Sequence, residues 1–92
     1  MKHVIQTVKN LLEEVDYYLR TIATKANSMS ESISAIDFGN GLNVARLYND
    51  IMELRNVARE LKAEVDIVVD NIERALDLLH VALKIMARRG EQ

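Results

Sequence analysis

The chain has 92 residues, of which 49% are hydrophobic and 28% charged, and its formal net charge is −2. This length fits one small domain, and the charge balance provides no basic face able to displace counterions from nucleic acid. Cysteine is absent, so disulfides and thiolate metal sites are excluded, and we expect a cytoplasmic protein. No apolar run reaches the roughly 18 residues of a membrane span. Proline is also absent, so nothing removes a backbone donor within a helix.

Apolar residues recur at alternating steps of three and four through two long stretches, which is the heptad pattern of packed helices. The first stretch contains Ile5, Val8, Leu12, Val15, Leu19, Ile22, Ala26, Met29, Ile33 and Ile36. The second contains Val44, Leu47, Ile51, Leu54, Ala58, Leu61, Val65, Val68, Ile72, Ala75, Leu79, Ala82 and Met86. We predict helices over about residues 2–36 and 43–89, joined by a loop at residues 37–42. So short a loop favours an all-α, antiparallel two-helix coiled-coil hairpin that forms a single domain over residues 1–92.

The helix ends carry recognisable signals. Asn43 is placed to cap the second helix, Gly39 or Gly41 can end the first in a left-handed conformation, and Gly90 can stop the second. The serine-rich segment at residues 27–34 leaves two alternatives: one continuous helix, which the unbroken heptad favours, or a new helix that starts at Ser28. Folding back should place residue i near residue 80−i, so that Leu11 lies near Val69 and residues 76–89 overhang the first helix.

Apolar residues also flank the predicted seam, and they concentrate at the open end of the hairpin. A lone hairpin cannot cover them, and soluble monomers rarely expose so large an apolar patch. We therefore expect a homodimer or higher homo-oligomer, in its simplest form a four-helix bundle. The seam offers no buried Asn that would fix a two-stranded rope, and its small residues suit a bundle. The predicted interface residues are Val4, Leu11, Val69, Leu76, Leu78, Leu83 and Ile85.

Phe38 is the only phenylalanine, and it lies in the predicted loop. It can either close the hairpin end against Leu42 or Leu47, which we favour, or lie exposed at the tip as a surface for an unknown protein partner.

Chemistry-bearing residues do not converge in this sequence. Asp77 and His80 have the spacing of helical metal ligands, but the heptad places both on the outer face. The segment from Arg74 to His80 loosely resembles the Arg-to-His spacing of HEPN ribonucleases, although Ala75 replaces the usual polar residue. An acidic series along the second helix resembles the carboxylates of MazG-type pyrophosphohydrolases, although Lys and Arg interrupt it. We predict no catalytic residue, no metal site and no cofactor.

The leading interpretation is a non-enzymatic interaction or assembly module that acts as an adaptor, scaffold or regulatory subunit. One alternative is a small secreted hairpin protein, because residues 38–41 resemble the aromatic-glycine turn of the WXG100 type, although tryptophan is absent. The other alternative is a small all-α metal- or nucleotide-dependent enzyme.

Overall fold

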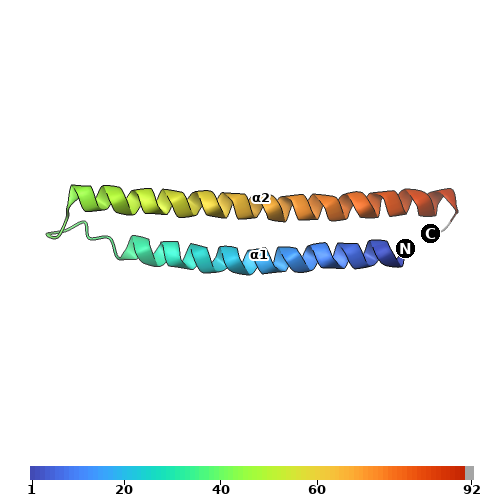
Figure 1. Cartoon of the computed structure of the whole chain (residues 1–92), viewed down its shortest axis with the longest axis horizontal. Coiled ribbons are helices and arrows are strands. Elements are labelled where there is room, and N and C mark those ends of the chain that lie inside the picture. The colour runs from blue at the N-terminus through green and yellow to red at the C-terminus, as the bar shows by residue number, and fades with distance from the viewer. Residues whose placement is uncertain (91–92) are drawn as a thin grey trace.

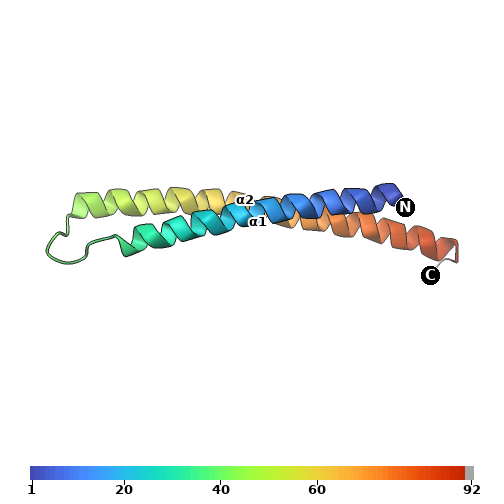
Figure 2. The same ribbon diagram turned by 90° about the horizontal axis from the view of Figure 1, so that it is seen from below.

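The computed structural model describes residues 1–90 as a helical hairpin. Helix α1 spans Lys2–Ser34 and helix α2 spans Val44–Arg88. The helices run in opposite directions side by side, so that the start of α1 and the end of α2 lie at the same end of the molecule (Figure 1). The Cα atoms extend over 73 × 16 × 15 Å. Figure 2 shows that the helices cross at a shallow angle near their middle. The predicted all-α hairpin is confirmed, and each helix end lies within two residues of its expected position.

Helix α1 continues without a break through its serine-rich last turns. The Ser34 hydroxyl donates a hydrogen bond of 3.1 Å to the carbonyl oxygen of Ser30, one turn back. Such back-bonding lets serine stay within a helix instead of starting a new one. The alternative of a second helix that begins at Ser28 is therefore wrong.

The caps follow the sequence signals at two of the three ends for which the sequence provides one. Asn43 caps α2, because its side-chain oxygen accepts a hydrogen bond of 3.1 Å from the backbone N–H of Arg46. Gly90 has a φ of 72° and follows the last turn of α2 as expected. The expectation for the end of α1 was wrong, because among residues 1–90 only Gly90 has a positive φ. Ala35 instead ends α1 in a right-handed conformation, with its N–H bonded to the carbonyl of Glu31.

Asp37 organises the loop between the helices. Its carboxylate accepts a hydrogen bond of 2.8 Å from the backbone N–H of Gly39. Its other oxygen approaches Gly41 so closely that a Cβ atom at that position would clash. Gly41 therefore leaves room for the Asp37 carboxylate in a side-chain-centred turn, which replaces the expected left-handed helix end.

The helices meet along a different set of heptad positions from the one predicted. Half of the predicted positions do face the partner helix, and we call them the shared row. They are Val8, Val15, Ile22, Met29 and Ile36 on α1, and Leu47, Leu54, Leu61, Val68, Ala75 and Ala82 on α2, all buried or half-buried. The other half of the seam is an inner row, whose residues each stand one position before one of the remaining predicted seam residues. It consists of Val4, Leu11, Tyr18 and Lys25 on α1, and Asp50, Val57, Glu64, Asn71 and Leu78 on α2, again buried or half-buried.

The remaining predicted seam residues form an outer row that is largely exposed to solvent. It consists of Ile5, Leu12, Leu19, Ala26 and Ile33 on α1, and Val44, Ile51, Ala58, Val65 and Ile72 on α2. Leu79 and Met86 continue this row on α2 and are half-buried. The placement of the exposed members of this row in the seam was wrong, because the structure turns both helices so that the less apolar inner row meets the partner helix.

The register of the two helices is close to the folding-back rule. Leu11 contacts Asn71, two residues beyond the expected Val69. The overhang of α2 is correspondingly shorter than expected. Ala82 is still only 5% exposed, so α1 still covers α2 at this position. The free end of α2 therefore begins beyond residue 82 rather than near residue 76.

Candidate functional site

The outer row lies on one side of the hairpin. Each of its residues directly follows an inner-row position, as Leu12 follows Leu11 and Ile72 follows Asn71. Since each residue advances a helix by about 100°, the outer row is rotated from the inner row by this angle, in the same sense along the chain on both helices. Because the two helices face each other and run in opposite directions, this rotation brings both outer rows to the same side of the hairpin. The outer rows of α1 and α2 therefore form one surface, which we call the outer face.

The outer face is apolar along the whole hairpin. The exposed fractions of its large side chains on α1 and, on α2, from Val44 to Ile72 run from 41% at Ile72 to 75% at Val44. On α2 the face widens toward the C-terminus, where Val69, Leu76 and Leu83 follow the outer row by four residues and are 44%, 60% and 64% exposed. A contiguous patch of this size rarely stays uncovered on a monomeric protein.

The predicted interface residues divide between two locations. Val69, Leu76, Leu83 and Ile85 are exposed on α2. Leu11 is only 7% exposed, and Val4 and Leu78 are half-buried, so these three already contact the partner helix of their own hairpin. They were predicted to flank the seam because the seam was assigned to the residues that directly follow them, such as Leu12 instead of Leu11. The outer row was missed as an exposed surface for the same reason.

Charged side chains occupy part of the inner row, where Lys25 and Glu64 meet across the seam. The Lys25 ammonium forms an ion pair with the Glu64 carboxylate across the seam and lies 3.6 Å from Glu60 Oε2. The hydrogen bond to Glu64 is the main reason why the pKa of Lys25 is raised above 10.5. Lys25 is therefore held as a cation and is not available as a neutral nucleophile at neutral pH.

Among residues 1–90, Asn71 is the most buried polar residue, with 4% exposure. Its side-chain amide donates a long hydrogen bond of 3.4 Å to the carbonyl oxygen of Leu11. The expectation of a seam without buried Asn was wrong, because that expectation took the neighbouring Ile72 as the seam residue. A buried Asn disfavours alternative registers at some cost in stability.

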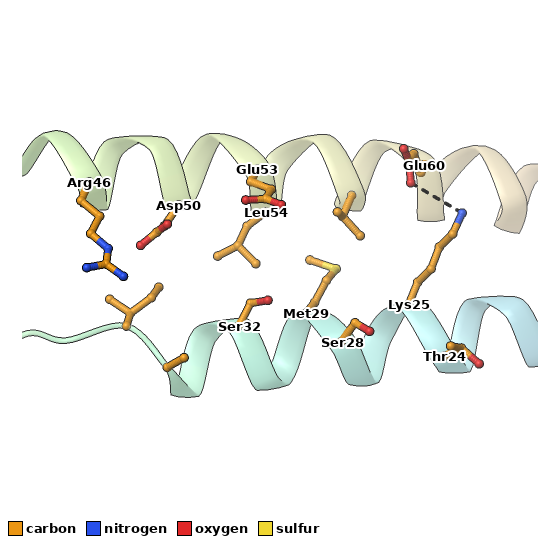
Figure 3. A pocket seen from close by; sticks show the side chains of 13 residues that line it. Thr24, Lys25, Ser28, Met29, Ser32, Arg46, Asp50, Glu53, Leu54 and Glu60 are labelled. Carbon is orange, nitrogen blue, oxygen red and sulfur yellow. Dashed lines mark ion pairs between the residues drawn. The ribbon is translucent and has the colours of Figure 1, made fainter.

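A groove of about 440 Å³ lies between the helices near the loop (Figure 3). Its floor contains Met29 and Leu54, which point toward each other, and Lys25 reaches across its far end to Glu60. Small side chains of α1, including Ser28 and Ser32, leave this space open. Besides Met29 and Leu54 of the shared row, the groove is lined by inner-row residues such as Lys25 and by residues that directly precede the shared row, such as Ser28 and Glu53. The groove therefore faces away from the outer face. It holds ordinary surface charges and no arrangement of base and nucleophile.

Phe38 is 67% exposed and Leu42 is 47% exposed. The interpretation that Phe38 closes the hairpin end is therefore wrong, and Phe38 lies at the exposed tip.

The residues considered for chemistry remain dispersed. Asp77, His80 and Arg74 are exposed on α2, and His3 is exposed on α1. Across residues 1–90 no three His, Cys, Asp or Glu side chains come together as a metal site would require. Within the same residues, neither helix has a stretch apolar enough to cross a membrane.

Comparison of the chain with family models, with curated proteins and with solved structures gives no match.

Proposed function

We propose that this protein is a non-enzymatic assembly module that works by protein–protein interaction as a helical-bundle homo-oligomer. The observation that carries the proposal is the inversion of polarity between two adjacent heptad rows. The inner row contains Lys25, Asp50, Glu64 and Asn71, whereas the outer row is entirely apolar. A hairpin that worked alone would gain most by burying the more apolar row.

Together the shared, inner and outer rows occupy three of the seven heptad positions on each helix, as the core-facing surface of a helix in a bundle does. A two-helix seam needs only two apolar positions in seven, whereas a helix in a bundle core presents a third beside them. In this hairpin the third position is the outer row. A second hairpin laid on the outer face covers it and completes a four-helix core, which supports the predicted homodimer.

The experiment is sedimentation of the purified chain and of two matched variants. Leu19→Lys places a charge on the outer face, where Leu19 is 49% exposed. Tyr17→Lys is the control, because Tyr17 is 65% exposed on α1 away from the outer face. We expect the unchanged chain and Tyr17→Lys to sediment as oligomers and Leu19→Lys as a monomer. A folded monomer of the unchanged chain at micromolar concentration, or an unaffected Leu19→Lys oligomer, would refute the proposal.

A further inference from the structure

The geometry points to a second copy of this chain as the occupant of the outer face, docked antiparallel about a twofold axis at Leu19 and Val65. This inference rests on the proposed function and specifies its interface. It follows from the levels at which the outer-row residues lie, from their volumes and from the flank of α2.

The contact between Leu11 and Asn71 shows which outer-row residues of the two helices lie at the same height along the hairpin, and we call each such pair a level. The next residues, Leu12 and Ile72, lie at about the same height along the hairpin. Steps of seven residues in opposite directions carry this pairing along both helices. The resulting levels are Ile5 with Leu79, Leu12 with Ile72, Leu19 with Val65, Ala26 with Ala58, and Ile33 with Ile51.

The outer face has the same centre on both helices. Leu19 is the middle residue of the row on α1. On α2 the row continues from Val44 to Met86, and its middle residue is Val65, at the level of Leu19. A twofold axis through this level therefore superimposes the whole length of one outer face on the other. The α2 overhang of each copy then lies over the loop end of its partner.

Side-chain volumes distinguish antiparallel from parallel docking. In the antiparallel arrangement the small level of Ala26 and Ala58 faces the large level of Leu12 and Ile72 of the second copy. In a parallel arrangement the alanine level faces itself and leaves a void, while Leu12 and Ile72 crowd against their equivalents. Cores pack best where large and small residues alternate across facing positions, so the antiparallel arrangement is favoured.

The flank of α2 is centred on the same axis. Its exposed residues one turn beyond the outer row are Tyr48, Arg55, Lys62, Val69, Leu76 and Leu83. Antiparallel docking places α2 on α2 of the second copy. Val69, Leu76 and Leu83 then meet Lys62, Arg55 and Tyr48 of that copy, respectively. Long amphipathic side chains such as Lys62 and Arg55 can cover Val69 and Leu76 with their aliphatic stems and keep their charges in water. Parallel docking would instead place Asp16 near Val69.

The area of the outer face suits a stable dimer. The hairpin is 73 Å long and about 15 Å across. This footprint exceeds the roughly 800 Å² that each partner buries in a standard protein–protein interface. A second copy can therefore supply an interface of sufficient size without any further component.

Single-cysteine variants test the docking, because the chain contains no cysteine. In the antiparallel dimer Leu19 meets Leu19 and Val65 meets Val65, so Leu19→Cys and Val65→Cys should each form a covalent dimer under oxidation or with a short bismaleimide. A docked pair has an effective concentration in the millimolar range, so at about 10 μM this reaction should run roughly a hundredfold faster than for Tyr17→Cys. A mixture of Leu12→Cys and Ala26→Cys chains should cross-link to each other.

The outcomes separate the docking from the proposed function. If the chain is dimeric but Leu12→Cys cross-links to Ile72→Cys of another copy and Leu19→Cys does not cross-link to itself, the docking is parallel and the inference is overturned while the assembly proposal stands. If the unchanged chain sediments as a folded monomer, both are overturned.

Discussion

Leu11 and Leu12 are neighbours in sequence with opposite surroundings in the hairpin. Leu11 is 7% exposed and faces α2, whereas Leu12 is 49% exposed on the outer face. Truncating each to alanine therefore separates the stability of the hairpin from the stability of the assembly. Leu11→Ala removes a buried side chain and should lower the free energy of unfolding by about 2–5 kcal/mol per chain.

The cost of Leu12→Ala depends on whether the outer face is covered. In an isolated hairpin about half of the Leu12 side chain is already in water, so truncation should cost about 1 kcal/mol, half the transfer free energy of a buried leucine. In a four-helix bundle Leu12 is buried, and the cost rises to the range of about 2–5 kcal/mol per chain. The two leucines then become nearly equivalent, although only one of them is buried in the single hairpin.

Urea denaturation followed by helical circular dichroism provides the measurement, at two protein concentrations that differ by roughly a hundredfold. The midpoint of an oligomer rises with concentration by mass action, and that of a monomer does not. Glu14→Ala is the control, because Glu14 is exposed and lies away from the outer face, and it should change the free energy by less than about 0.5 kcal/mol. If Leu12→Ala costs less than about 1 kcal/mol where the unchanged chain is assembled, the outer face is not the interface and the reasoning fails.

Four further results are expected. Asn71→Leu should raise the free energy of unfolding by about 1–3 kcal/mol, because it replaces a buried amide that has one long hydrogen bond; a lower midpoint in urea would contradict this. Asn43→Ala should lower it by about 1 kcal/mol through loss of the cap on α2, whereas an unchanged melting temperature would show that the cap is dispensable. The raised pKa of Lys25 implies a contribution to stability that is fully present below pH 10.5 and is lost as pH rises through the higher pKa of the folded state, so Lys25→Met should flatten this alkaline part of the profile and an unaltered profile would exclude Lys25 as its source. Ala26→Leu should weaken the dimer by overpacking against Leu12 of the second copy, and adding Leu12→Ala should restore it; equal sedimentation of the single and double variants would contradict the antiparallel layers.

The hairpin could be predicted from the sequence because two unbroken heptad stretches with a short connection leave few other folds. The orientation of each helix about its own axis could not. The chain offers apolar residues at three of seven positions, and choosing the two most apolar rows pairs Leu12 with Ile72. The structure instead pairs Leu11 with Asn71, and no count of apolar residues favours that choice.

Polar residues decide the difference, because their energy depends on partners that lie far away in the sequence. Lys25 is unfavourable in a seam until Glu60 and Glu64, more than 30 residues later, supply the opposite charge. Asn71 likewise needs a carbonyl oxygen on α1. A single polar residue argues against placing its heptad position in the seam, whereas a matched polar pair across two helices argues for placing both positions there. Only the register of the hairpin reveals which residues are matched.

This division of polar and apolar rows gives the two interfaces different properties. The inner row can tolerate few registers, since sliding one helix by a heptad separates Lys25 from Glu64 and leaves both charges without their partner in the seam. The outer row has no such constraint in its chemistry, and its specificity must come from shape, through the alanine level that accepts Leu12 and Ile72. Charge pairing therefore sets the fold of one chain, and volume sets the orientation of two. A variant that fills the alanine level without compensation should disturb the dimer while leaving the ion pair of Lys25 intact.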